Sequence, residues 1–164
     1  MQWGVETSTL DNEGEIVATS EVVPTTEQIE VMLSQMVGEI EIEVPKFSAV
    51  HINGKRAYDL ARKGIDFLPP KKVVRVERFE MLTLDNCRFD MEAIGEEYVH
   101  VANSHYFEVE CQTGTYIRSL AKLLGEKLGT KAIASVIIRT KVGDFDIKDA
   151  NRLEAVSLKD LLPV

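Results

Sequence analysis

The segment 106–129 constrains the fold most, because it combines a strand, a glycine turn and an amphipathic helix without interruption. After the turn at Gly114, apolar residues recur at helical spacing, and Gly129 follows them as a C′ glycine. These apolar residues are Ile117, Leu120, Ala121, Leu124 and Leu128. A stripe of this period buries one face of a helix against a core. The first turn of the helix therefore holds Tyr116 and Arg118 in a fixed direction, as a functional site requires.

Length and composition predict one globular domain, spanning residues 1–164. The chain is 45% hydrophobic and 28% charged, and a chain of this length buries roughly 70% of its unfolded surface. It contains neither an apolar run long enough to span a membrane nor a secretory signal pattern, so we expect no membrane partner and a cytoplasmic location. Cys87 and Cys111 form no CxxC pair, and we interpret both as reduced core or strand residues.

Periodicity and turn residues predict a series of short elements in the rest of the chain. They are a capped helix that follows Pro24-Thr25-Thr26 and ends near Gly38, a strand Glu39–Val44 with an acidic outer face, a short basic helix between Gly54 and Gly64, a long strand Val73–Leu84, a hairpin of Tyr98–Ala102 with Tyr106–Cys111, a buried strand Ala132–Thr140, an outward turn at Val142–Phe145 and a helix near Leu153–Leu162. The pattern indicates an α/β (α+β) fold with a mixed, largely antiparallel sheet flanked by helices.

The charge of the chain is unevenly distributed. The net charge is −8, yet residues 1–45 hold ten acids and no Lys or Arg, whereas residues 46–78 hold nine bases against three acids. Binding of a polyanion depends on local cation density, and aromatic residues lie among these bases, as on surfaces that bind RNA. A merely solvated charged face fits the same pattern. Tyr58 fits the edge of a core as well as a stacking platform.

Arg118 lies at the helix end that carries a partial positive charge and favours anions. A carboxylate or phosphate paired with its guanidinium would explain the placement, and a plain exposed arginine is the alternative. His51, His100 and His105 lack ligand spacing and have no evident nucleophile beside them, so we assign them no catalysis.

Several motifs resemble those of one family, the bacterial TruB-type tRNA pseudouridine synthases. They occur in the family's order along nearly the whole chain. They are Val5–Asp11 with Gly14-Glu15, Phe47-Ser48-Ala49 with Gly54, Arg56-Ala57-Tyr58, Ala61–Gly64, Gly114–Ala121 followed by Leu124-Gly125, and Arg139–Gly143.

The resemblance implies a pseudouridine synthase-like fold that isomerises a uridine in the T loop of tRNA, without cofactor or metal, after the nucleotide is flipped into a pocket. In the family an Asp carboxylate does the covalent chemistry, and the arginine that matches Arg118 pairs with it. Tyr116 and Ile137 match residues that line the base pocket, and residues 44–72 match a segment that docks on the tRNA T arm. The substrate-binding residues expected on this basis are Tyr116, Ile137, Gly114, Thr115, Ser48, His51, Lys55, Arg56, Tyr58, Arg62 and Lys63.

The sequence departs from the family in its catalytic segment. None of the 164 residues matches the family's Gly-Thr-Leu-Asp-Pro-x-Ala-Thr-Gly, and Asp11 aligns with a later Thr-x-Thr-x-Asp stretch, so we do not expect it to be the nucleophile. Arg118 is then expected to lack its carboxylate partner and the chain to be inactive alone. We expect either an amino-terminally truncated gene product or a separate polypeptide that supplies the missing front. His51 replaces a family lysine, which weakens a phosphate contact, and no carboxy-terminal RNA-binding domain is recognised.

Two other classes of function remain open from the sequence. The chain could be a non-catalytic RNA-binding or RNA-remodelling module that keeps the T-arm surface. It could also be a protein-interaction domain whose acidic amino-terminal segment meets a basic partner.

Overall fold

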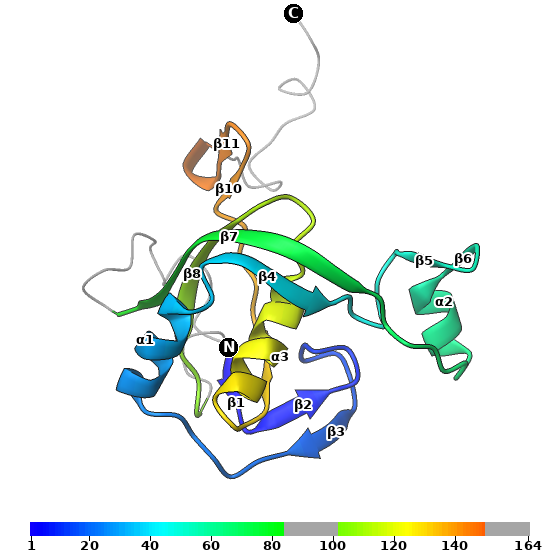
Figure 1. Ribbon diagram of the computed structural model, residues 1–164, viewed down its shortest axis with the longest axis horizontal. Coiled ribbons are helices and arrows are strands. Elements are labelled where there is room, and N and C mark those ends of the chain that lie inside the picture. The colour runs from blue at the N-terminus through cyan, green and yellow to red at the C-terminus, as the bar shows by residue number, and fades with distance from the viewer. Residues whose placement is uncertain (84–101, 150–164) are drawn as a thin grey trace, which may run out of the picture.

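The computed structural model describes residues 1–83 and 102–149 (Figure 1). Every strand pair in these ranges is antiparallel, which confirms the α+β class and the largely antiparallel sheet. The elements are β1 (Gln2–Trp3), β2 (Val5–Thr7), β3 (Ile16–Thr19), α1 (Thr26–Ser34), β4 (Gly38–Glu43), β5 (His51–Ile52), β6 (Lys55–Arg56), α2 (Ala57–Arg62), β7 (Lys71–Leu82), β8 (Tyr106–Cys111), α3 (Ile117–Lys127), β9 (Ala132–Ile133), β10 (Lys141–Val142), β11 (Phe145–Asp146) and a 3-10 turn (Ile147–Asp149).

The sheet β4-β7-β8 covers the two longer helices. Figure 1 shows it arching over α1 and α3, with the β2–β3 hairpin on the far side of α3. β4 alternates as the sequence predicts, with exposed glutamates on one face and Ile40 and Ile42 turned toward the core. The core between these layers is apolar and tightly buried; it includes Trp3, Ile29, Leu33, Met36, Ile42, Val74, Val76, Phe79, Leu120 and Leu124.

The two longer helices begin where the sequence predicts. Thr25 caps α1 in a capping box, in which its hydroxyl accepts from the Gln28 N–H and the Gln28 side chain accepts from the Thr25 N–H. α1 ends at Ser34, four residues before Gly38. α3 follows Tyr116 and ends before Gly129, whose φ of +71° is the left-handed conformation of a C′ glycine.

Three predicted elements differ from the structure or fall outside it. The expected strand Ala132–Thr140 is wrong beyond its first two residues, because β9 pairs only with the two-residue β1, and Ile137 is 38% exposed. The predicted strand Tyr98–Ala102 and the predicted helix near Leu153–Leu162 lie outside the described residues, except for Ala102, which forms a turn.

Residues 46–68 form a lobe that stands beside the body of the protein (Figure 1). It contains the hairpin β5–β6 and the helix α2, whose Ala57 and Leu60 are buried. Two connections, at residues 44–45 and 69–70, form a neck between the body and the lobe. There the Val44 N–H donates to the carbonyl of Pro70 at 2.9 Å. Pro45 and Pro69, the next residues on the lobe side, have no N–H and cannot extend this ladder.

Candidate functional site

The turn before α3 depends on a glycine. Gly114 has a φ of +81°, and a Cβ atom there would lie 2.8 Å from the Lys72 Nζ. Lys72 donates to the Gly114 carbonyl at 3.1 Å, and the Thr115 hydroxyl donates to the Gln112 carbonyl at 2.8 Å. The turn is thus fastened to β7, and it directs the first turn of α3 toward the amino-terminal part of the chain.

Arg118 brings together three segments that are distant in sequence. Its Nη1 donates to the carbonyl of Thr9 at 2.8 Å and to Oδ2 of Asp11 at 2.9 Å. Its Nη2 donates to the carbonyl of Phe47 at 3.0 Å. The side chains of Arg118 and Asp11 are 22% and 23% exposed, so the ion pair is largely shielded from water. The expected negative group beside Arg118 is confirmed, and it is Asp11. The absence of the nucleophilic aspartate that the resemblance pairs with Arg118 stays a prediction.

Asp11 is held by its own turn between β2 and β3. Its Oδ1 accepts from the Thr9 hydroxyl at 2.5 Å and from the Glu13 N–H at 3.0 Å, so both carboxylate oxygens are engaged. A Cβ at Gly14 would lie 2.4 Å from the Thr9 hydroxyl, so only glycine allows the turn to close this tightly. The acid is therefore oriented before any ligand is present.

The same turn is fastened to the segment that follows β9. The Leu10 carbonyl accepts from the Ala134 N–H at 3.2 Å, and the Asn12 amide donates to the Ser135 carbonyl at 3.0 Å. These bonds explain why strand pairing ends after Ile133. The backbone groups of Ala134 and Ser135 form hydrogen bonds with the Asp11 turn instead of with a neighbouring strand.

The remaining residues expected near Arg118 are only partly brought together. Tyr116 is half-buried and packs against the core cluster, and Ile137 is partly exposed after β9. Ser48 directly follows Phe47, whose carbonyl binds Arg118. Its side chain is 7% exposed, and its hydroxyl has no hydrogen-bond partner among the described residues. A buried polar group without a partner is uncommon and calls for an explanation.

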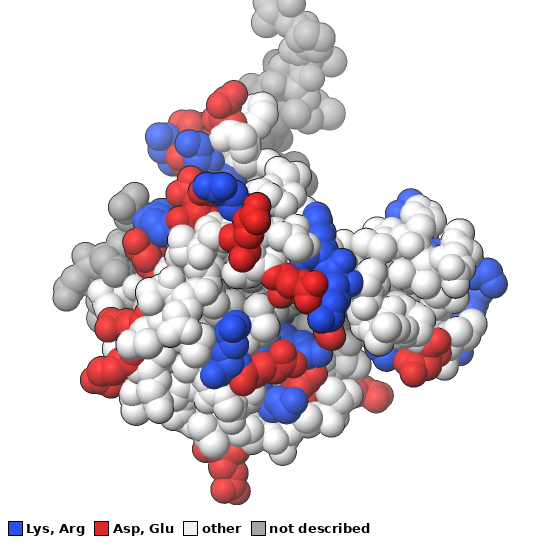
Figure 2. Space-filling model, in the orientation of Figure 1, with Lys and Arg blue, Asp and Glu red and all other residues white. Residues whose placement is uncertain are grey.

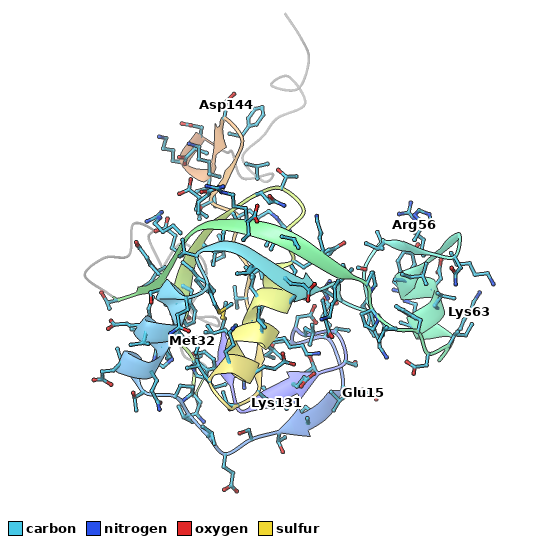
Figure 3. The ribbon with its side chains drawn as sticks, viewed as in Figure 1. Glu15, Met32, Arg56, Lys63, Lys131 and Asp144 are labelled. Atoms are coloured by element: carbon cyan, nitrogen blue, oxygen red, sulfur yellow. The ribbon has the colours of Figure 1, made fainter. Side chains whose placement is uncertain are left out.

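The lobe carries most of the other expected binding residues. Residues 46–68 hold five cations against two acids. Figure 2 shows Lys and Arg side chains at separate points on the edge of the lobe and a group of them at its junction with the body. A hollow of about 340 Å³ opens on the lobe, lined by His51, Gly54, Lys55, Arg56, Asp59, Leu60, Lys63 and Ile65. Arg56 and Lys63 point away from the body (Figure 3).

Two aromatic residues of the lobe, Tyr58 and Phe67, lie close to cations. The Arg62 guanidinium lies 5.5 Å from the centre of the Tyr58 ring, and the Lys46 ammonium lies 5.9 Å from that of Phe67. The Arg56 Nη1 donates to the Ala49 carbonyl at 2.6 Å. The lobe is therefore a cationic and aromatic surface stabilised by its own short-range contacts.

Sequence reasoning missed Thr9 and Asp11 as residues of the site. The signal was present in the Thr-x-Asp spacing ahead of Gly14, which is typical of a turn in which a side chain binds its own backbone. No local pattern states which arginine such a turn faces.

In ranges 1–83 and 102–149, no three His, Cys, Asp or Glu side chains gather closely enough to hold a metal ion. No helix in these ranges is both long enough and apolar enough to cross a membrane.

The known proteins that this chain resembles share one name, tRNA pseudouridine synthase B. The tRNA pseudouridine synthase B of Caulobacter vibrioides is 38% identical over 154 residues, which cover 94% of this chain and 45% of that protein. The proteins of the same name from Borreliella burgdorferi strain ZS7 and Caldicellulosiruptor saccharolyticus are 37% and 35% identical over 98% and 100% of this chain, and 52% of each is covered. The chain thus spans about half the length of these curated relatives.

The family model described as TruB family pseudouridylate synthase (N terminal domain) matches residues 1–117. This range contains the Asp11 turn, Phe47 and the whole lobe, and it ends one residue before Arg118. Because the model match covers most of the chain and the relatives align over almost all of it, the chain belongs to the TruB family of pseudouridylate synthases.

Proposed function

We propose that this chain takes part in the isomerisation of a T-loop uridine of tRNA to pseudouridine, and that it supplies the arginine side of the active site. The names of its relatives and its family membership support the reaction class. The observation that carries the proposal is the state of the Arg118 guanidinium. Three of its five N–H groups bind Thr9, Asp11 and Phe47, and Nε–H and one Nη2–H have no partner among the described residues.

The free edge of Arg118 suits a second carboxylate. Nε–H and Nη2–H point in parallel, the geometry in which arginine binds a carboxylate through two hydrogen bonds. In the proposed reaction the N1–C1′ bond of uridine breaks and the C5–C1′ bond forms, N1 takes up a proton and the C5 proton leaves to water. An aspartate that attacks the nucleotide must stay ionised, and Arg118 would favour that form. We propose that this aspartate belongs to a segment outside these 164 residues, carried by the same gene product or by a separate polypeptide.

Asp11 is better suited to hold Arg118 than to attack. Both of its oxygens already accept hydrogen bonds, and a nucleophilic carboxylate needs a free lone pair directed at its target. The alternative in which Asp11 itself is the nucleophile remains testable in the same assay.

The lobe is proposed to dock on the T arm. Its five cations would neutralise phosphates, and its exposed position beside the body allows contact with a bulky RNA helix. The unpartnered Ser48 hydroxyl lies in the lobe, directly after Phe47, whose carbonyl binds Arg118, and a hydrogen bond to the bound nucleotide would satisfy it.

The test is release of tritium from T-arm RNA that carries 5-tritiated uridine, with the protein at stoichiometric concentration. The chain is assayed alone and with a polypeptide that carries the Gly-Thr-Leu-Asp-Pro segment of a relative. We expect release only with the added polypeptide, and none when Arg118→Ala replaces the wild type. Release by the chain alone that disappears in Asp11→Asn would make Asp11 the nucleophile. RNA binding without release in either mixture would instead favour a non-catalytic RNA-binding module.

A further inference from the structure

A second group of charges is centred on the same helix as Arg118 and includes residues of β2 and β4; it takes no part in the proposed chemistry. Glu6, on β2, is the most shielded acid among the ion pairs of the described residues, with a side chain 15% exposed. Its Oε2 lies 2.7 Å from the Lys131 Nζ, and its Oε1 lies 3.7 Å from the Lys122 Nζ. Lys131 lies beside β2 near the end of α3 (Figure 3).

Lys122 is the centre of this group. Besides Glu6, its ammonium lies 3.3 Å from a carboxylate oxygen of Glu43 and 3.7 Å from one of Glu126. Burial alone lowers the pKa of Lys122, but the hydrogen bond and charge of Glu43, followed by the charges of Glu6 and Glu126, outweigh it and raise the pKa. Lys122 therefore stays charged at neutral pH and ties β2 and the end of β4 to α3.

This arrangement repeats the Arg118 contact one helical turn away. Residues four apart on a helix lie on the same face, so Arg118 and Lys122 point to the same side of α3. Arg118 pairs with Asp11 in the turn that ends β2, and Lys122 pairs with Glu6 inside β2. Two ion pairs thus connect one helix to one hairpin, and the pair at Glu6 limits how the Asp11 turn can slide or tilt against α3.

We propose that Lys122 is a positioning residue, which together with Glu6 fixes the β2–β3 hairpin against α3 and so sets the geometry between Asp11 and Arg118. The effect of Lys122 on catalysis rests on the proposed function. Its effect on the position of the hairpin does not depend on that function. Loss of Lys122 leaves Glu6 paired with Lys131, so no acid of the group becomes isolated in a shielded place. The variant should therefore fold and differ mainly in the freedom of the hairpin.

The test observes the Arg118 guanidinium in the whole 164-residue chain labelled with ¹⁵N-arginine. It uses about 0.5 M salt, so that direct long-range attraction between Lys122 and Asp11 is screened. In the wild type, hydrogen bonds to three groups should slow rotation of the guanidinium and give separate Nη signals. In Lys122→Met we expect these signals to merge, and in Lys122→Arg we expect them to separate again.

The control is Lys127→Met, which removes the same charge from an exposed position on the last turn of α3 and should leave the Arg118 signals unchanged. Glu6→Gln serves as a second variant, because it weakens the same contact from the β2 side and should reproduce the merged signals even if Lys122→Met fails to fold. Unchanged Arg118 signals in the folded variants would overturn the proposal.

A second readout separates this proposal from the proposed function. In the tritium-release mixture, Lys122→Met should lower kcat by about 10-fold to 100-fold with KM for T-arm RNA unchanged, because a small displacement of a catalytic group costs that much. If the wild type releases no tritium while the Arg118 signals respond as expected, the proposed function fails and the positioning role stands. Equal rates of tritium release in Lys122→Met and Lys127→Met would show that the contact between Lys122 and Glu6 does not affect catalysis.

Discussion

The body around Arg118 and the lobe of residues 46–68 use cationic side chains in different ways. In the body, one arginine binds two segments that lie up to 109 residues away in the chain, and its surroundings exclude most of the water. In the lobe, five cations lie within 23 residues, and the described contacts of Arg56 and Arg62 are local. The body therefore fixes the geometry of a few groups, whereas the lobe presents charge to a large partner.

The sharpest way to test this contrast is to remove a leucine from each region. Leu120→Ala, at a fully buried position beside the site, should lower the free energy of unfolding by about 3 kcal/mol, because a core cavity forms. Leu60→Ala should loosen α2 and change the stability of the body little. Denaturant unfolding followed by Trp3 fluorescence reports the body, and hydrogen exchange of α2 amides reports the lobe. An equal effect of both substitutions on the Trp3 transition would show that the two regions unfold as one.

An arginine removed from each region gives the next largest difference. Arg118→Ala should lower the free energy of unfolding by about 2 kcal/mol, since it breaks three hydrogen bonds and leaves Asp11 without its cation in a shielded place. Arg56→Ala removes one exposed bond to Ala49 and should cost less than about 0.5 kcal/mol. Thermal unfolding of both variants beside the wild type measures the difference. A loss in Arg56→Ala as large as that in Arg118→Ala would contradict the division between the regions.

For tRNA binding we expect the opposite ranking, in which substitutions in the lobe have a larger effect than Arg118→Ala. Lys55→Ala combined with Arg56→Ala should weaken binding and reduce the salt slope of log K by up to ~2, because two phosphate contacts disappear. Arg118→Ala should leave the slope unchanged. The matched control is Lys127→Ala combined with Arg139→Ala, which removes two cations exposed on the body. A slope equal in all variants would exclude the lobe as the docking surface.

The smallest expected effect is a response to acid that is confined to the body. The Trp3 indole donates to Nδ1 of His105 at 2.8 Å, so His105 must be neutral at this atom. Burial, and secondarily the charge of the Met1 amino group, lowers the pKa of His105 below its ordinary 6.5. The unfolded state therefore takes up the proton first, and stability should fall as the pH drops through about 6.5.

The single tryptophan of the chain reports this response. We expect Trp3 emission to shift between pH 7 and pH 5 in the wild type, and the shift to be smaller in His105→Gln, which keeps a side-chain acceptor but does not titrate. A residual shift is expected, because burial lowers the pKa of the Met1 amino group to about 6 and this group donates to the His105 carbonyl. An identical shift in both proteins would place the titrating group elsewhere.

Local structure could be predicted from the sequence, and the site could be predicted only in part. The capping box of α1, the alternation of β4 and the glycine after α3 are decided by residues a few positions apart. The family resemblance pointed to Arg118, and helix electrostatics predicted an anion beside it.

The partner itself could not be predicted, because Asp11 and Arg118 are 107 residues apart and meet only through packing of the β2–β3 hairpin against α3. The predicted length of the strand that begins at Ala132 was wrong for the same reason. Ala132–Thr140 has the composition of a strand, but strand pairing needs a neighbour, and the backbone at Ala134 and Ser135 binds the Asp11 turn instead.

The neck between body and lobe has a consequence for conformational entropy. The β4–β7 ladder ends at the bond between Val44 and Pro70, and Pro45 and Pro69 fix their own φ angles directly beyond it. Restrained torsions at both connections limit the orientations that the lobe samples before a partner arrives. A partner that docks on both regions then loses less orientational freedom than it would on a freely hinged lobe, so more of the contact energy remains as affinity.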